Sequence, residues 1–103
     1  MTRFSFSPDA ELDIDDITRY LQELPQEPAL RIGRDLQRAI YAIARFPGLG
    51  RVDERLTRQA NPRIRRFVSG QYVLFYYIAE QSIRFLGVLP GKRDIDEIMR
   101  RRF

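Results

Sequence analysis

The sequence predicts an α+β fold with an N-terminal strand, an α-helical hairpin packed on a mostly antiparallel sheet, a three-stranded C-terminal meander and a short C-terminal helix. Two patterns indicate this fold. Apolar residues recur at helical spacing in two successive segments between residues 8 and 45, and three short apolar segments with brief connections follow residue 62. The length of 103 residues suits a single domain, residues 1–103, with a core of limited size.

The N-terminal part of the chain predicts a strand followed by a helix. Residues 2–7 alternate polar and apolar, which is typical of a short strand. Ser7 and Pro8 then open the helix, because serine caps helices well and proline is tolerated at the first helical position. Pro25 ends this helix. Its apolar residues recur at steps of three and four: Ala10, Ile14, Ile17, Leu21 and Leu24.

A second helix is predicted from Pro28 to about Arg45. Gly33 lies at the edge of its apolar face, where the missing side chain permits close approach of the first helix. The apolar face consists of Ile32, Leu36, Ala39, Ile40 and Ile43. A basic stripe on the roughly opposite side consists of Arg31, Arg34, Arg38 and Arg45. Such a stripe is either an ordinary solvated helix face or a docking ridge for an acidic partner.

The second half of the chain predicts a meander of strands. Residues 46–51 form a turn-rich end of the hairpin, and residues 52–62 suggest an irregular basic loop. Strands are expected at residues 63–68, 72–79 and 82–89, and the middle one is apolar on both faces, as a central strand should be. The third strand alternates, with one face made of Ile83, Phe85, Gly87 and Leu89. Residues 94–103, in which acids precede three arginines, suit a last short helix.

Composition excludes several classes of function. The chain has no cysteine and no histidine, which excludes disulfides, thiolate nucleophiles, Cys/His zinc sites and Ser–His pairs. We therefore expect no catalytic residue of these kinds, no metal and no cofactor. The longest apolar run, Tyr72 to Ala79, is too short to cross a membrane, and the first residues do not resemble a signal peptide. These features predict a cytoplasmic protein.

Charge is distributed unevenly along the chain. The net charge is +4, but residues 1–27 carry two arginines and seven acids, a net of −5, whereas residues 28–76 carry ten arginines and three acids, a net of +7. All basic residues except Lys92 are arginines, which bind carboxylates and phosphates in a planar, bidentate manner. The arginine bias has two explanations, genomic base composition and an acidic partner.

The candidates for contact with a macromolecular partner are Arg31, Arg34, Arg38, Arg63, Arg65, Arg66, Arg93, Arg100, Arg101 and Arg102. Arg65 and Arg66 are neighbours in a strand, so their side chains must point to opposite faces; one could pair with an acid of the first helix while the other reaches a partner. Asp94 is expected to start the last helix, with Arg93 bonded to nearby carbonyls or carboxylates. The run Arg100 to Arg102 could hold phosphate or an acidic surface, or form a solvated helix end.

Four local signatures occur in order along nearly the whole chain. They are Ser7-Pro8 with Ala10, Asp13, Ile14, Ile17 and Tyr20; Phe46-Pro47 with Gly50-Arg51; Arg66-Phe67 with Gly70, Tyr72, Phe75 and Tyr76; and Val88-Leu89 with Arg93-Asp94. In this order and spacing, the sequence resembles the ParE-type toxins of the RelE/ParE superfamily, which belong to bacterial type II toxin–antitoxin operons. Pro90 departs from the pattern, because many relatives have a histidine there.

The resemblance implies a toxin that acts by binding other macromolecules. It implies neutralisation by a ParD-like antitoxin, whose acidic, amphipathic C-terminal segment wraps the toxin, and inhibition of DNA gyrase as the toxic activity. The alternative is the RelE branch, whose members cleave mRNA on the ribosome. RelE-like enzymes without a catalytic histidine use a tyrosine close to the C-terminus, whereas Phe103 has no hydroxyl. Direct nucleic-acid binding is not favoured, because the central aromatics alternate into both faces and form no stacking platform.

Overall fold

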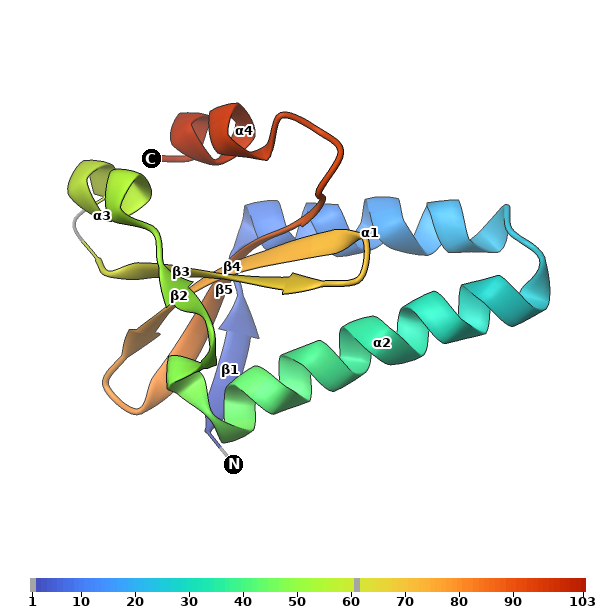
Figure 1. The fold of residues 1–103 in the computed structure, drawn as a ribbon, viewed down its shortest axis with the longest axis horizontal. Helices are drawn as coiled ribbons and strands as arrows, with labels where there is room; N and C mark the ends of the chain where they lie inside the picture. The colour runs from blue at the N-terminus through green and yellow to red at the C-terminus, as the bar shows by residue number, and fades with distance from the viewer. Residues whose placement is uncertain (1, 61) are drawn as a thin grey trace.

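The elements of the chain follow one another as a strand, two long helices, a short strand–helix segment, three strands and a last helix (Figure 1). The computed structural model describes residues 2–60 and 62–103. The elements are β1 (Arg3–Phe6), α1 (Pro8–Gln22), α2 (Gln26–Arg45), the 3-10 helix η1 (Pro47–Leu49), β2 (Arg51–Val52), α3 (Glu54–Ala60), β3 (Ile64–Ser69), β4 (Tyr72–Ala79), β5 (Ser82–Pro90) and α4 (Ile95–Arg101). In this described part of the chain, no helix is long and apolar enough to cross a membrane.

The strands form one five-stranded sheet in the order β1-β5-β4-β3-β2. β1 runs parallel to β5 and the other neighbours are antiparallel, so the sheet is mostly antiparallel, as predicted. β4 is the central strand, and its residues 72–76 are buried. The helical hairpin of α1 and α2 packs on one face, and α3 and α4 pack on the other. The protein therefore has an apolar cluster on each face of the sheet.

The cluster beneath the hairpin follows the sequence pattern. Ser7 caps α1, since its Oγ accepts a hydrogen bond from the Ala10 amide at 3.1 Å. The two helices pack closely at Gly33, where an added Cβ would lie 3.8 Å from Leu21 Cδ1. α2 begins at Gln26, slightly earlier than predicted. The buried residues that the hairpin contributes to this cluster are Ala10, Ile17, Leu36, Ala39 and Ile43.

The predicted assignment of faces along β5 is wrong beyond Phe85. A β-bulge between Phe85 and Gly87 adds Leu86 as an extra residue opposite β4. The alternation is inverted after the bulge. Val88 therefore faces the hairpin together with Phe85, whereas Leu89 packs in the cluster beneath α3 and α4. A regular period of two, read from the sequence, cannot reveal this extra residue.

The prediction of an irregular loop over residues 52–62 is also wrong, because most of this segment is β2 and α3. Asp53 caps α3, its Oδ1 accepting a hydrogen bond from the Leu56 amide at 3.0 Å. Leu56 is buried in the cluster on that face of the sheet. A helix this short, with a single buried side chain, shows no helical period in the sequence. Asn61 lies outside the described residues.

The predicted C-terminal helix is confirmed as α4. Asp94 caps it, since Asp94 Oδ1 accepts a hydrogen bond from the Glu97 amide at 3.4 Å. Ile95 and Met99 are buried against the sheet. The helix approaches β5 closely at Gly87, where an added Cβ would lie 2.7 Å from Met99 Sδ. α4 and α3 thereby cover the face of the sheet that the hairpin leaves open.

Candidate partner-binding surfaces

The basic stripe predicted on α2 is exposed to solvent. Arg31, Arg34 and Arg38 are all exposed, which confirms the predicted orientation of the stripe. Arg34 borders a hollow of about 560 Å³ between α1 and α2, and Arg31 borders an adjoining hollow of about 430 Å³. The apolar residues that line the larger hollow are Leu21, Leu24, Ala29 and Leu30. We call these two adjoining hollows the hairpin groove, and Leu30, which is 56% exposed, lines both of them.

The three arginines around the start of β3 have different environments. Arg63 is exposed. Arg65 points to the end of the hairpin, where its Nη1 donates hydrogen bonds to the carbonyls of Gly48 and Gly50 at 3.3 and 2.7 Å. Arg66 lies on the opposite face, as predicted. Among the described residues, neither Arg65 nor Arg66 pairs with an acid of α1, so that part of the prediction is wrong.

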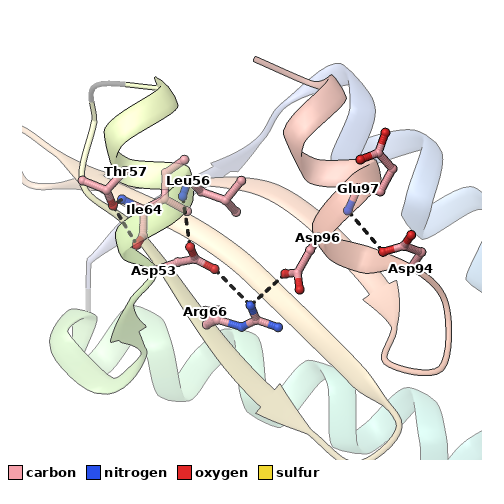
Figure 2. A network of polar contacts seen from close by, with 8 residues as sticks. All are labelled: Asp53, Leu56, Thr57, Ile64, Arg66, Asp94, Asp96 and Glu97. Atoms are coloured by element: carbon pink, nitrogen blue, oxygen red, sulfur yellow. Dashed lines mark hydrogen bonds and ion pairs between the residues drawn. The ribbon is translucent and has the colours of Figure 1, made fainter.

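Arg66 is the centre of a network that joins β3 to the two helices on that face of the sheet (Figure 2). Its Nη1 donates to Asp53 Oδ2 and to Asp96 Oδ1, each at 3.0 Å. Its guanidinium also lies over the ring of Phe75, 5.1 Å from the centroid. The side chains of Arg66 and Asp53 are only 16% and 10% exposed. Arg66 therefore connects the start of α3 to the first turn of α4.

Among the described residues, the most buried ion pair is the one between Arg102 and Asp13 of α1. The two terminal nitrogens of Arg102 each contact one oxygen of Asp13 at 2.8 Å, and Nη1 also donates to the Leu86 carbonyl at 2.9 Å. Asp13 Oδ2 accepts a further hydrogen bond from the Val88 amide at 2.9 Å. The hydrogen bonds to Asp13 raise the pKa of Arg102. This arginine was a candidate for partner contact, but the fold uses its guanidinium internally.

The other two arginines of the C-terminal run lie at the surface. Both contact Glu97, with Arg100 Nη2 at 2.6 Å and Arg101 Nε at 3.0 Å from its Oε1. Hydrogen bonds from Arg100 and Arg101 hold the pKa of Glu97 below its usual range. These contacts favour the interpretation of the run as a solvated helix end, with Arg102 as the exception.

Arg93 and Lys92 border a hollow of about 210 Å³ between α1, the β3–β4 turn and the β5–α4 turn. Both side chains are exposed. The prediction that Asp94 starts the last helix is confirmed, because Asp94 caps α4. The prediction that Arg93 bonds to nearby carbonyls or carboxylates is wrong, because the described residues include no hydrogen-bond partner for its side chain. The apolar residues that line the hollow include Ile17, Tyr20, Tyr72, Val88, Leu89 and Pro90. We call this feature the α1–β5 hollow.

The arrangement of a helical hairpin, a sheet and basic surfaces has known relatives. Residues 4–95 match the family described as the ParE toxin of the type II toxin–antitoxin system parDE. The chain belongs to the ParE toxin family. Toxin ParE1 of Caulobacter vibrioides is 38% identical over 79 residues, which cover 76% of this chain and 78% of that protein.

The fold of this ParE family member is also similar to a solved structure. A chain from the chromosomal ParDE toxin–antitoxin system of P. aeruginosa matches with a TM-score of 0.67 and 18% sequence identity. The match covers 89% of this chain and 98% of that chain. At this low identity the match establishes the shared fold alone.

The two buried tyrosines of β4 are poorly suited to proton transfer. The Tyr76 hydroxyl donates to the Pro47 carbonyl at 2.7 Å and accepts from the Gly50 amide at 2.8 Å. Burial raises the pKa of Tyr76, and burial also raises the pKa of Tyr72. A general acid or base works best with a pKa near the operating pH. The hydroxyls of Tyr72 and Tyr76 in this ParE protein are therefore better suited to a structural role than to proton transfer.

The residues that the sequence reasoning missed are carboxylates. Asp13 follows Ala10 by three positions and precedes Ile17 by four, so it lies on the apolar face of α1. That spacing is a signal that Asp13 is buried and needs a partner. Asp53 and Asp96 give no such signal, because each lies in a polar segment and is recruited only when β3 brings Arg66 between them.

Proposed function

We propose that this chain is the toxin of a type II toxin–antitoxin pair, neutralised by a ParD-like antitoxin, and that it acts in the cytoplasm by binding and inhibiting DNA gyrase. Membership of the ParE family supports the first part of the proposal. The observation that carries the antitoxin interaction is the hairpin groove, an apolar depression bordered by exposed arginines.

The hairpin groove fits an acidic, amphipathic helix. Such a helix would lay its apolar face on Leu24 and Leu30 and bring its carboxylates near Arg31 and Arg34. Exposed charges of this kind steer association and fix the register of a bound helix. Arg38, one turn further along α2, extends the same basic surface. A partner bound here would also stabilise a small core, because binding to the folded state alone raises stability.

Binding is better supported than mRNA cleavage. Arg65 donates hydrogen bonds to backbone carbonyls, and Arg66 forms ion pairs with Asp53 and Asp96. Arg102 forms an ion pair with Asp13. These three guanidinium groups therefore already have partners within the fold. Arg63 and Arg93 remain exposed and could stabilise the charge on a phosphate, but cleavage also requires a group that transfers protons. The buried Tyr76 is likewise committed to the loop after α2.

A supercoiling assay tests the proposal. Purified gyrase is incubated with the toxin, with and without the product of the neighbouring reading frame. We expect inhibition that this product relieves. Growth arrest on expression without inhibition of gyrase would contradict the proposal and favour ribosome-dependent RNA cleavage, which primer extension on translated mRNA would detect.

A further inference from the structure

The α1–β5 hollow has an apolar floor and lies where three segments meet. Ile17 of α1, Tyr72 of β4 and Val88 of β5 belong to the buried core, and all three line it. Tyr20, which is 42% exposed, also lines it. The cavity volume of about 210 Å³ gives room for one large apolar side chain. In Figure 1 the tip of the β3–β4 hairpin lies beside α1, next to the chain leading from β5 to α4.

Among the described residues, the carboxylates that line this hollow have partners within the fold, whereas its two cations have no carboxylate partner. Asp13 is bound by Arg102 and the Val88 amide, and Asp16 contacts Arg19. By contrast, the described residues place no carboxylate within ion-pair distance of Lys92 or Arg93, the two cations of the rim. The free charge at the hollow is therefore positive, beside an apolar floor.

We propose that the α1–β5 hollow is the contact site for the target, and that it receives one aromatic or branched aliphatic side chain from an acidic segment of that protein. Carboxylates of the segment pair with Lys92 and Arg93 while the apolar side chain covers Ile17 and Tyr72. This inference rests on the proposed function, and it identifies the surface that meets gyrase. A nucleic-acid backbone fits less well, because phosphates would engage the two cations and leave the apolar floor uncovered.

The hollow and the hairpin groove are separate surfaces. No residue lines both, although α1 contributes to each, with Tyr20 in the hollow and Leu21 in the groove. Substitutions in one can therefore leave the other intact. The other described hollows, around α3 and α4, are less suited to an acidic segment, because Arg66 and Arg100 in their linings already pair with carboxylates of the fold. The proposal therefore places the target at the α1–β5 hollow and the antitoxin in the hairpin groove.

The experiment compares two charge reversals of equal size. The variant K92E/R93E alters the hollow, and R31E/R34E, also at exposed positions, is its matched control in the groove. Each is assayed for inhibition of gyrase supercoiling and for binding to the purified antitoxin. We expect K92E/R93E to need about tenfold more protein for half-inhibition, with antitoxin binding unchanged, and the control to show the opposite pattern.

A second variant, Tyr20→Ser, removes an apolar wall of the hollow without changing charge. It should also weaken inhibition, and thermal unfolding checks that each variant is folded. The inference is overturned if K92E/R93E inhibits gyrase as strongly as the wild type does. It is also overturned if this variant loses antitoxin binding by the same factor as it loses gyrase inhibition. If the wild type does not inhibit gyrase, the proposed function fails first and the inference fails with it. If K92E/R93E instead loses RNA cleavage in a translating extract, the hollow contacts RNA and not gyrase.

Discussion

Asp13 and Arg102, which are 89 positions apart in the sequence, form a buried bidentate ion pair with both nitrogen–oxygen distances at 2.8 Å. The side chains are only 7% and 15% exposed. The pair connects α1 to the end of α4 across the bulged segment of β5, where the Leu86 carbonyl and the Val88 amide complete its hydrogen bonds. A pair of this kind is costly to break, because the remaining charge stays buried.

Replacing Asp13 by alanine should therefore strongly destabilise the protein. We expect a loss of about 3–5 kcal/mol in the free energy of unfolding, since Arg102 would be left without its carboxylate. Urea unfolding measures the change. The matched control is Asp16→Ala, which removes an exposed acid three positions further along α1 and should cost no more than about 1 kcal/mol. Equal losses for the two variants would mean that the pair is not structural.

Arg66→Ala should also lower stability, by about 2–4 kcal/mol, because Asp53 would lose its partner in a site that is largely shielded from water. Arg63→Ala, at an exposed position of the same basic cluster, should change stability by less than about 0.5 kcal/mol. Denaturant titrations of both variants test this difference. A toxicity assay on a variant that combines Arg66→Ala with other substitutions would consequently confuse unfolding with loss of partner contact.

Gly87→Ala should displace α4. The added methyl group would lie 2.7 Å from Met99 Sδ and 3.0 Å from Arg102 Nη1. We expect a cost of about 1–3 kcal/mol from this overpacking, measured by thermal or urea unfolding. Gly48→Ala is the matched control, since nothing lies within 4 Å of a Cβ at that position. A neutral Gly87→Ala would indicate that α4 adjusts freely.

Tyr76 makes stability sensitive to alkaline pH. Burial raises its pKa above the ordinary value of 10.0, so the folded state holds this proton more tightly than the unfolded state does. The contribution of this raised pKa to the free energy of unfolding is fully present below the pKa of the tyrosine in the unfolded state. It is lost as pH rises through the pKa in the folded state. Tyr76→Phe should flatten this alkaline decline while costing about 1–2 kcal/mol at neutral pH, because the bonds to Pro47 and Gly50 are lost. Unfolding curves at neutral pH and above pH 10 measure both effects, and a decline as steep as that of the wild type would contradict the assignment.

The sequence by itself determined the helical hairpin, its cap and the C-terminal meander of β3, β4 and β5. These features depend on neighbours close in the chain. Ser7 binds an amide three residues away, and the buried residues of α2 recur at helical spacing. The exposed stripe of Arg31, Arg34 and Arg38 follows from the same period. Local periodicity was sufficient for these parts, because burial of one helix face repeats every few residues.

Only the tertiary structure decided which arginines are free. Arg93 and Arg102 are the same residue type in the same C-terminal segment, yet one is exposed at a hollow and the other is bound to Asp13. The difference depends on the bulge at Leu86, which inverts the faces of β5. The Leu86 carbonyl there accepts a hydrogen bond from the guanidinium of Arg102. A single inserted residue changes the direction of every later side chain in a strand. Carboxylate partners that lie far away in the sequence are set by that packing and leave no local pattern.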